Sequence, residues 1–590
     1  MSKTAEQAKQ AKASGQATVA EKGNDEQQLS SSPASAPQPP LPPPPPPKDR
    51  LSGLKENWKH DLVSSLIIFL IALPLSLGIA MASGVPPMAG LIAAVVGGML
   101  LSQVNGSYVT ISGPAAGLIV VILGTVDRLG GGEVGYHGAL AACVISGLIL
   151  ALLGTFKAGK LADFVPSAVV HGMLAAIGLI IIIKQIPFLL GVQVAAKEPF
   201  HILLALPSML ASLNPQIAII GLTSLLILVG HNMLAKGFLK KLPAPIIVVV
   251  VGAIMGTIFQ MEAPHNYLWS GHSYTMVPQK ILVTLPSNLS QAFVFPDFSK
   301  IATSAFWVSV MSITLIQGLE TLLSCVAVDK LDPYKRKSNP SKDMAAVGAC
   351  SVVSAAVGGL PMIAEIVRST ANIMAGARTR WSNFFHGLFI LIAILFCTQL
   401  IHRIPLTALS AILIVTGYNL TAPAVWKKTR AIGIEQTIIF AVTVIATLAT
   451  DLLVGVVLGI LTKAVLHLLS GAPIRNFFKA QVSVLTINEK VIRVLIRPIA
   501  IFSNYLSIKS CLEKLPTSKH IVLDMQDMVL IDHTAIEHLH QFQQDYERSG
   551  GRVSIVGLEK LTARSNHPQA ARRLINTDKQ GKGSKLAVAG

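Results

Sequence analysis

Two apolar stretches of the chain are each interrupted by glycine and proline, at Ile111-Ser112-Gly113-Pro114-Ala115-Ala116-Gly117 and at Gly358-Gly359-Leu360-Pro361-Met362-Ile363-Ala364-Glu365-Ile366-Val367-Arg368-Ser369. Proline removes a backbone donor and glycine weakens a helix, so each stretch is predicted to start a helix inside a bilayer. A helix N-terminus presents unpaired N–H groups and partial positive charge, which suit an anion. Broken helices at matching places in two halves of a membrane protein predict a binding site between them.

The composition is that of a polytopic α-helical membrane protein. Of the 590 residues, 52% are hydrophobic and only 13% are charged, with a mean hydropathy of +0.59, whereas soluble proteins carry about a quarter charged residues. The net charge of +18 is explained by basic cytoplasmic loops rather than by a nucleic-acid partner. The sequence contains no nucleophile–base arrangement or metal-ligand spacing, so we expect neither an enzyme nor a resident cofactor or metal.

Fourteen apolar segments lie between Leu62 and about Ser470 and are predicted to span the membrane. Their approximate ranges are 62–82, 86–102, 112–126, 137–155, 164–190, 215–235, 243–260, 304–328, 344–358, 362–376, 383–401, 405–420, 433–450 and 452–470. Lysine and arginine concentrate in alternate loops, for example at 236–241, 335–342 and 427–430. The positive-inside rule then predicts that both termini are cytoplasmic. We expect the protein in the inner or plasma membrane.

The long outer segment at about 261–303 divides the membrane region into two halves of seven segments. Because seven is odd, the second half must enter the membrane in the opposite orientation, which is the geometry of an inverted repeat. The two broken stretches are the third segment of each half.

Three further regions flank the membrane domain, which we place at 54–470. Residues 1–50 form a proline-rich tail without aromatic residues and are predicted to be disordered. Residues 481–565 alternate β-branched strands with helices and predict a small cytoplasmic α/β domain. The basic, glycine-rich residues 566–590 are predicted to form a second disordered tail.

Three charged residues, Glu320, Glu365 and Arg368, lie inside apolar segments. A charge at the bilayer centre costs about 2.5–3.5 kcal/mol, so each is expected to face a cavity or a partner. Glu365 and Arg368 share a helix face, where they neutralise each other or Arg368 adds positive potential to an anion site. Ser324 follows Glu320 by one helical turn. These two residues could ligate sodium, Glu320 could carry a proton, or the carboxyl could make a structural hydrogen bond.

The chain resembles the SulP family of anion transporters, which includes sulfate permeases, cyanobacterial bicarbonate transporters and mammalian anion exchangers. The resemblance covers about residues 58–565. It rests on Ala72-Leu73-Pro74-Leu75-Ser76-Leu77, Ala82-Ser83-Gly84-Val85-Pro86-Pro87, Ile111-Ser112-Gly113-Pro114-Ala115, Glu320-Thr321-Leu322-Leu323-Ser324, Gly358-Gly359-Leu360-Pro361 and Arg368-Ser369-Thr370-Ala371-Asn372-Ile373.

The resemblance implies a homodimer in which a core domain moves against a gate domain, with the anion between the third and tenth helices. The anion-site residues that it implies are Leu75, Ile79, Ser112, Gly113, Pro114, Ala115, Ala116, Glu365, Ile366, Val367 and Arg368. It also matches Glu320 and Ser324 to the acid and hydroxyl that cation-coupled members use. The chain departs from many relatives in the bulky run at 362–367, where Glu365 would repel an anion unless it is paired or protonated.

The C-terminal domain is similar to the STAS domain of this family, through Val522-Leu523-Asp524-Met525 and Leu530-Ile531-Asp532-His533-Thr534-Ala535-Ile536. In the related bacterial anti-sigma-factor antagonists, a serine after the aspartate is phosphorylated. Thr534 occupies that place, so it is interpreted as a phosphorylation site or as part of a helix N-cap. A cytoplasmic protein partner of this domain is a further implication of the resemblance.

The expected function is secondary active transport of a small inorganic oxyanion, either sulfate or bicarbonate, coupled to sodium or protons. Two alternatives stay open at this stage. The first is a nucleobase permease, which shares the membrane fold. The second is an uncoupled anion channel or a membrane-tethered sensor that works through the C-terminal domain.

Overall fold

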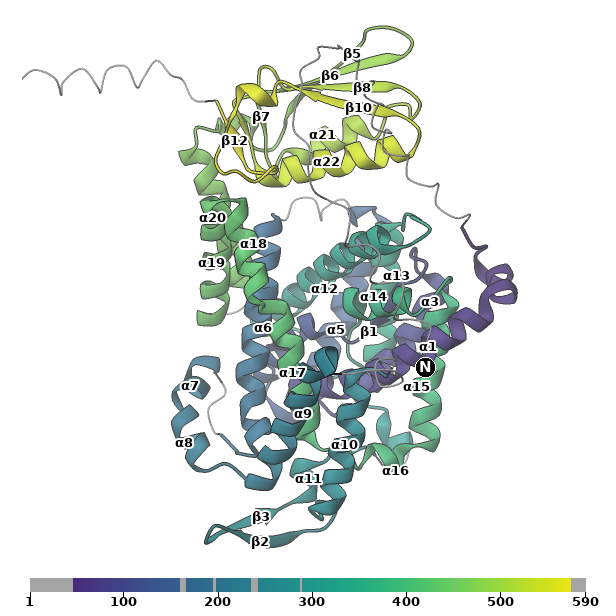
Figure 1. The fold of residues 1–590 in the computed structure, drawn as a ribbon, viewed down its shortest axis with the longest axis vertical. Helices are drawn as coiled ribbons and strands as arrows, with labels where there is room; N and C mark the ends of the chain where they lie inside the picture. Colours follow the sequence, from purple (N-terminus) through teal and green to yellow (C-terminus); the bar gives the residue numbers. More distant parts are fainter. Residues whose placement is uncertain are drawn as a thin grey trace, which may run out of the picture. The chain divides into compact units, whose positions relative to one another are not determined.

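The computed structural model describes residues 46–159, 166–194, 198–234, 242–286, 289–450 and 452–574 (Figure 1). Each of the predicted apolar segments contains a helix. These helices are α1 (Arg50–Ala82), α2 (Pro87–Val96), α4 (Ile119–Arg128), α5 (Gly132–Thr155), α6 (Ser167–Leu190), α9 (Pro215–Leu234), α10 (Ala244–Ile258), α12 (Ser304–Leu331), α13 (Pro340–Ala356), α14 (Ile366–Met374), α15 (Trp381–Phe396), α17 (Leu406–Thr421), α19 (Ile434–Ala449) and α20 (Leu452–Leu469). Within the described ranges, seven helices are long and apolar enough to cross a membrane.

Short elements connect these helices. They are the π-helix η1 (Gly97–Leu101), α3 (Ser102–Val104), the 3₁₀-helix η2 (Ala116–Leu118), α7 (Pro199–Leu204), α8 (Leu206–Ala211), the hairpin of β2 (His265–Trp269) and β3 (His272–Met276), α11 (Pro278–Ile281), η5 (Leu289–Ala292), α16 (Thr398–Ile401), α18 (Pro423–Ile432) and η6 (Ile474–Asn476). The β2–β3 hairpin and α18 were not predicted. The basic loops at 236–241 and the tail at 1–45 lie outside the described residues.

The membrane helices pack as two groups. The first group contains α1, α2, α4, α5, α12, α13, α14 and α15, and the second contains α6, α9, α10, α17, α19 and α20. Glycines permit the close crossings within each group: Gly178 of α6 faces Gly417 of α17, and Gly98 of η1 faces Gly387 of α15. Such small residues let helix backbones approach in a membrane, where packing replaces the hydrophobic effect as the driving force.

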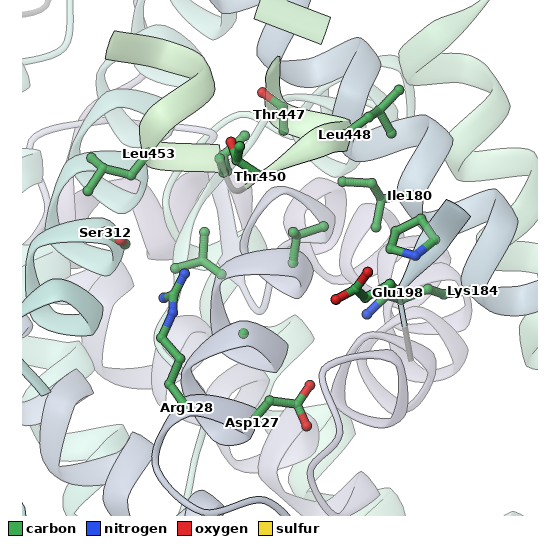
Figure 2. Close-up of a pocket in the computed structure, with 15 residues that line it drawn as sticks. Asp127, Arg128, Ile180, Lys184, Glu198, Ser312, Thr447, Leu448, Thr450 and Leu453 are labelled. Atoms are coloured by element: carbon green, nitrogen blue, oxygen red, sulfur yellow. The ribbon is translucent and has the colours of Figure 1, made fainter. Parts of the chain in front are cut away.

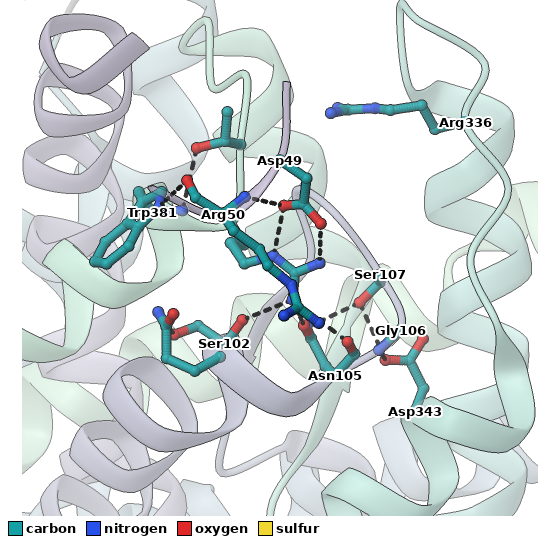
Figure 3. A network of polar contacts seen from close by, with 12 residues as sticks. Asp49, Arg50, Ser102, Asn105, Gly106, Ser107, Arg336, Asp343 and Trp381 are labelled. Carbon is teal, nitrogen blue, oxygen red and sulfur yellow. Dashed lines mark hydrogen bonds and ion pairs between the residues drawn. The ribbon is translucent and has the colours of Figure 1, made fainter. Parts of the chain in front are cut away.

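A polar network holds the chain where it approaches the first broken segment (Figure 3). Arg380 binds Asp49 with an N–O distance of 2.7 Å and donates to the carbonyl groups of Ser102 and Asn105. Asp343 accepts from the backbone N–H of Gly106 at 2.8 Å. Partial burial opposes ionisation of Asp49, but the hydrogen bond and charge of Arg380 outweigh it and lower the pKa of that carboxyl. The network fixes the segment after α3 to the start of α1 and of α15.

The C-terminal domain is an α/β fold built on two sheets. The first sheet has the order β10-β8-β6-β5, and the second has the order β11-β12-β9-β7. Its elements are β5 (Gln481–Thr486), β6 (Val491–Arg497), β7 (Ile499–Ala500), α21 (Tyr505–Leu512), β8 (His520–Asp524), β9 (Leu530–Ile531), α22 (His533–Arg548), β10 (Arg552–Val556), η7 (Leu558–Lys560), β11 (Thr562–Ala563) and β12 (Arg572–Arg573). In Figure 1 α21 and α22 lie along the first sheet, and their apolar faces fill one core with it.

The predicted domain boundary at residue 565 is wrong by several residues. Strand β12 pairs with both β9 and β11, and Ala570 is fully buried. Residues 566–574 were assigned to the tail because their basic and small side chains show no apolar periodicity. Their backbone nevertheless adds a strand to the second sheet. Residues 575–590 lie outside the described part of the chain.

The crossing of η1 and α15 yields a first prediction. A methyl group on Gly98 would overlap the backbone of Gly387, so we expect Gly98→Ala to destabilise the detergent-purified protein by about 1–3 kcal/mol, the usual cost of overpacking. Gly124→Ala in α4 is the matched control, because the nearest atom to its new methyl would be 4.0 Å away. Thermal unfolding measures the stability of both variants. Equal melting temperatures would contradict the close contact between Gly98 and Gly387.

Candidate functional site

The two broken segments pair with each other. Strand β1 (Ile111–Gly113) runs antiparallel to β4 (Ile363–Glu365), with Ile111 opposite Glu365 and Gly113 opposite Ile363. Each strand leads into its own helix, α4 after the turn η2 and α14 directly. Because the strands are antiparallel, the two helices leave the strand pair in opposite directions and both N-termini lie beside it. The sequence predicted the two helix starts, but it did not predict the strands or their pairing.

Both helix starts lack a side-chain cap. Ala115 precedes η2 and Glu365 precedes α14 in extended conformation, and neither side chain bonds the N–H groups that follow. The first N–H groups of a helix have no partner within the helix. The strand pair therefore lies beside two helix starts that have no side-chain cap and carry partial positive charge, an arrangement that suits an anion.

Polar residues within apolar helices hold β1 in place, and the sequence reasoning did not identify them. Ser369 accepts from the N–H of Ile111 at 2.9 Å, and Asn372 donates to the carbonyl of Val109 at 2.9 Å. Asn383 of α15 accepts from the N–H of Ser112 at 3.4 Å. The available signal was the presence of serine and asparagine inside apolar segments, where an unsatisfied polar group is costly.

Arg368 joins the two breaks. Its side chain is fully buried, and its Nη2 donates to the carbonyl of Pro114 at 3.0 Å. Its Nε lies 3.0 Å from Oε2 of Glu365. Gly113 leaves the space that the guanidinium occupies, since a methyl there would lie 2.9 Å from Nη1. Both interpretations of the Glu365–Arg368 spacing therefore apply. The two opposite charges are in contact, and the guanidinium also lies beside strands β1 and β4.

Glu320 of α12 faces the other helix start. It is buried, its Oε1 has no hydrogen-bond partner, and a methyl group on Gly117 would overlap its carboxylate. Ser324 is also buried one turn further along α12. Gln317, one turn earlier, donates to the carbonyl of Met362 at 2.8 Å. One helix thus touches both breaks, through Gln317 at the second and Glu320 at the first.

The remaining predicted residues divide between covered and accessible positions. Ile79 is buried in one cluster with Ala115, and Ala116 packs against that cluster. Leu75 packs instead in the neighbouring cluster that contains Ile111. At the start of α14, Ile366 and Val367 are 38% and 67% exposed, so this helix start is not covered by protein.

A cavity of about 370 Å³ lies farther along α4, between the two helix groups (Figure 2). Its charged lining residues are Asp127 and Arg128 at the end of α4, Lys184 of α6 and Glu198 before α7. No residue of β1 or β4 lines this cavity. Its acidic and basic side chains are equal in number, whereas the strand pair has two helix N-termini, so we place the candidate site at the strand pair.

The membrane region matches the model of the sulfate permease family over residues 58–467, and residues 481–572 match the STAS domain. The chain belongs to the sulfate permease family. Among its relatives, it is 26% identical to "Putative sulfate transporter YvdB" of Bacillus subtilis over 85% of this chain and 92% of that one. It is 24% identical to the bicarbonate transporter BicA of Picosynechococcus over 70% of each chain.

Two solved structures share the fold. The transmembrane domain of a cyanobacterial bicarbonate transporter BicA superposes with a TM-score of 0.57 at 22% identity, over 69% of this chain and 97% of that one. The murine Solute Carrier 26 family member A9 anion transporter, solved in the inward-facing state, gives 0.59 at 16% identity over 84% and 85%. The chain is therefore a multi-pass anion transporter of this family with a C-terminal STAS domain, and it is not an enzyme.

A buried ion pair fastens the STAS domain to the last membrane helix. Nζ of Lys463 in α20 lies 2.9 Å from Oδ2 of Asp532, and both side chains are almost fully buried. Asp532 also caps α22, because it accepts from the N–H of Ala535 at 2.7 Å. Lys463 donates to Thr534 at 2.6 Å.

Thr534 is 1% exposed, so the hydroxyl interpreted as a phosphorylation site is covered. A kinase would reach it only after the junction had opened. Asp532, not Thr534, is the N-cap residue of α22. The role of Lys463 was not foreseen, because it lies in an apolar segment and its partners follow much later in the sequence.

Removing the lysine tests this junction. We expect Lys463→Met to cost about 3–5 kcal/mol of stability, because the carboxylate of Asp532 is left buried without its cation. Limited proteolysis between α20 and β5, together with thermal unfolding, measures the effect. Arg497→Ala is the control, since the Arg497–Asp527 pair is exposed on both sides and such pairs contribute about 0–1 kcal/mol. Equal protease sensitivity of the two variants would argue against a fastening role.

The buried Lys463–Asp532 ion pair also leads to a prediction about pH. Burial opposes ionisation of Asp532, but the charge of Lys463 and the N–H of Ala535 outweigh it and hold the pKa of this carboxyl below its usual range. A carboxyl with a lowered pKa contributes stability that is complete above the unfolded value and is lost as pH falls through the folded value. The Asp532 carboxyl should therefore leave protease sensitivity at the junction unchanged between pH 7 and pH 5. Burial lowers the pKa of the adjacent His533, so this residue should raise the sensitivity as pH falls toward 5, because the unfolded chain takes up a proton that the folded histidine does not. A rise that persists in His533→Asn would contradict this assignment.

Proposed function

We propose that this protein is a secondary active transporter of a small inorganic oxyanion, with sulfate and bicarbonate as the candidate substrates. The observation that carries the proposal is the β1–β4 strand pair with two uncapped helix starts beside it. Relatives named as sulfate and bicarbonate transporters support this substrate class. The family membership favours an anion over the nucleobase alternative.

The membrane domain is proposed to be a 7+7 inverted repeat with both termini in the cytoplasm. The basic loops support the orientation of the termini, and three observations support the repeat. Each predicted segment contains a helix, the third segments of the two halves pair antiparallel, and corresponding segments of the halves fall in the same helix group. A homodimer and a cytoplasmic partner of the STAS domain are proposed on the family resemblance alone.

Transport is proposed to occur by movement of one helix group against the other. The first group, as the core, carries the strand pair, Glu320 and Arg368 and would move as a unit. The second group, as the gate, packs along α4, and the cavity between the groups would be an approach to the site. Leu75, Ile79, Ile366 and Val367 would supply apolar surface around Ser112, Gly113, Pro114, Ala115 and Ala116.

Cation coupling is proposed to run through Glu320 and Ser324. A buried carboxylate oxygen without a partner is costly unless a cation or a proton joins it. A sodium ion or proton at Glu320 would lie beside Gly117, at the same helix start that faces the anion. Binding of the cation would thus remove a negative charge from the neighbourhood of the anion and favour its binding, which is the physical basis of symport.

Uptake into proteoliposomes tests the proposed function. The wild type should accumulate labelled sulfate or bicarbonate under an inward sodium or proton gradient. Glu320→Gln should still equilibrate the anion down its own gradient but should not accumulate it, because an amide has no negative charge to hold sodium and cannot take up a proton. Glu262→Gln, in an exposed ion pair with Arg403, is the control. Absence of uptake of either anion under every gradient would refute the function, and conductance without coupling would indicate a channel.

Gly117→Ala provides an independent test of the same cation site. The added methyl would overlap the carboxylate of Glu320 and displace it. Accumulation of the anion should therefore fall at least tenfold, although Glu320 itself is not mutated. Gly256→Ala in α10, where the added methyl would make only ordinary contacts at 3.5 and 3.6 Å, should accumulate the anion like the wild type. A Gly117→Ala variant with wild-type sodium and proton dependence would remove Glu320 from the coupling role.

A further inference from the structure

Glu365 places a carboxylate at the mouth of a site that should bind an anion. It is the last residue of β4 and the residue before α14, opposite Ile111 across the strand pair. Its side chain is 13% exposed. One carboxylate oxygen, Oε2, contacts Arg368, whereas the other, Oε1, has no hydrogen-bond partner. A carboxylate oxygen is an acceptor, so Oε1 is suited to a ligand atom that donates a hydrogen.

The charges around the strand pair nearly cancel. The Arg368 guanidinium is compensated by Glu365 at 3.0 Å. Glu320 is compensated by the proposed coupling cation. His386 of α15 is fully buried and neither ring nitrogen has a partner, which favours a neutral ring because an unpaired buried charge is very costly. The remaining charge comes from the two helix N-termini, about half a unit each. About one positive charge is therefore available for the anion.

This charge balance and the free acceptor distinguish two kinds of oxyanion. Sulfate has two negative charges and only acceptor oxygens, so it would keep one uncompensated charge and meet Oε1 without a proton between them. Bicarbonate has one negative charge and an O–H that could donate to Oε1. A site that hydrogen-bonds a substrate hydroxyl strongly rejects an analogue without it, because the polar group is then left unpaired.

We propose that Glu365 determines substrate specificity and selects a monovalent oxyanion that carries a hydroxyl donor, such as bicarbonate, over sulfate. The proposal rests on the proposed function and specifies the substrate of the same site. It assigns Arg368 the task of holding Glu365 and the Pro114 carbonyl in place. Nη1 of Arg368 has no hydrogen-bond partner and is a donor open to either anion, so it does not discriminate between them. Ile366 and Val367, which follow Glu365, provide no competing donor or acceptor side chain.

The test compares three anions in proteoliposomes that contain the full chain. Bicarbonate is monovalent with a donor, nitrate is monovalent without a donor, and sulfate is divalent without a donor. For the wild type, uptake of labelled bicarbonate should exceed that of labelled sulfate at least tenfold at equal concentration. Unlabelled nitrate should compete less well than bicarbonate and better than sulfate, which separates the effect of charge from that of the donor.

Glu365→Gln should reverse this preference. The amide adds a donor and removes one negative charge, so the ratio of bicarbonate to sulfate uptake should fall at least tenfold, mainly through better uptake of sulfate. Glu365→Asp keeps the carboxylate and should keep the wild-type order of anions. Glu262→Gln, far along the chain in an exposed pair, should leave the ratio unchanged. Protection of the wild type from thermal unfolding by each anion gives the same ranking without relying on the folding of any variant.

The outcomes separate this inference from the proposed function. Sulfate uptake equal to or above bicarbonate uptake in the wild type would overturn the role of Glu365 while the anion transporter stood. An unchanged ratio in a folded Glu365→Gln variant would do the same. Absence of uptake and of thermal protection by all three anions would overturn both.

Discussion

The antiparallel contact between two three-residue strands, β1 and β4, is the constraint on which the membrane domain depends. Unpaired backbone groups cannot be left in a bilayer, so a helix can break there only where protein replaces its lost hydrogen bonds. Here the two breaks pair with each other through the strands, and Ser369, Asn372 and Asn383 supply three further partners. The geometry that satisfies the backbone also sends α4 and α14 in opposite directions with free N–H groups at the centre. The fold of this region and the candidate binding site therefore have one physical origin.

Arg368 gives this arrangement its charge balance. A buried guanidinium facing an anion directly would favour multivalent substrates, but here it contacts Glu365 and the carbonyl of Pro114. The pair contributes rigidity and almost no net charge. In the proposed mechanism, the coupling cation would compensate the Glu320 carboxylate, whose Oε1 has no hydrogen-bond partner, and would lie beside Gly117 at the start of η2.

Much of the fold could be predicted from the sequence because its signals are local. Glycine and proline at 113–114 and 358–361 marked the breaks, apolar length marked the membrane helices, and β-branched alternation marked the C-terminal domain. The strands and helices predicted to alternate in the C-terminal domain are present, for example β10 and α22.

What could not be predicted depends on contacts between distant residues. Three-residue strands have too little periodicity to be recognised, and β4 follows β1 only after seven intervening membrane helices. The pairing of Arg368 with Glu365 could be considered from their spacing, but its bond to Pro114 could not. In the sequence, nothing distinguishes Lys463 from another residue of an apolar helix. Its role follows only from its contact with Asp532 in the folded protein. For the same reason Thr534 looked like an accessible hydroxyl, although the junction covers it.

The position of a bound anion tests the central claim most directly. An experimental structure of the full chain with its transported anion should show the anion between the starts of η2 and α14, within hydrogen-bond distance of backbone N–H groups on both sides. Density for the anion in the cavity lined by Asp127 and Lys184, with the strand pair empty, would contradict the account.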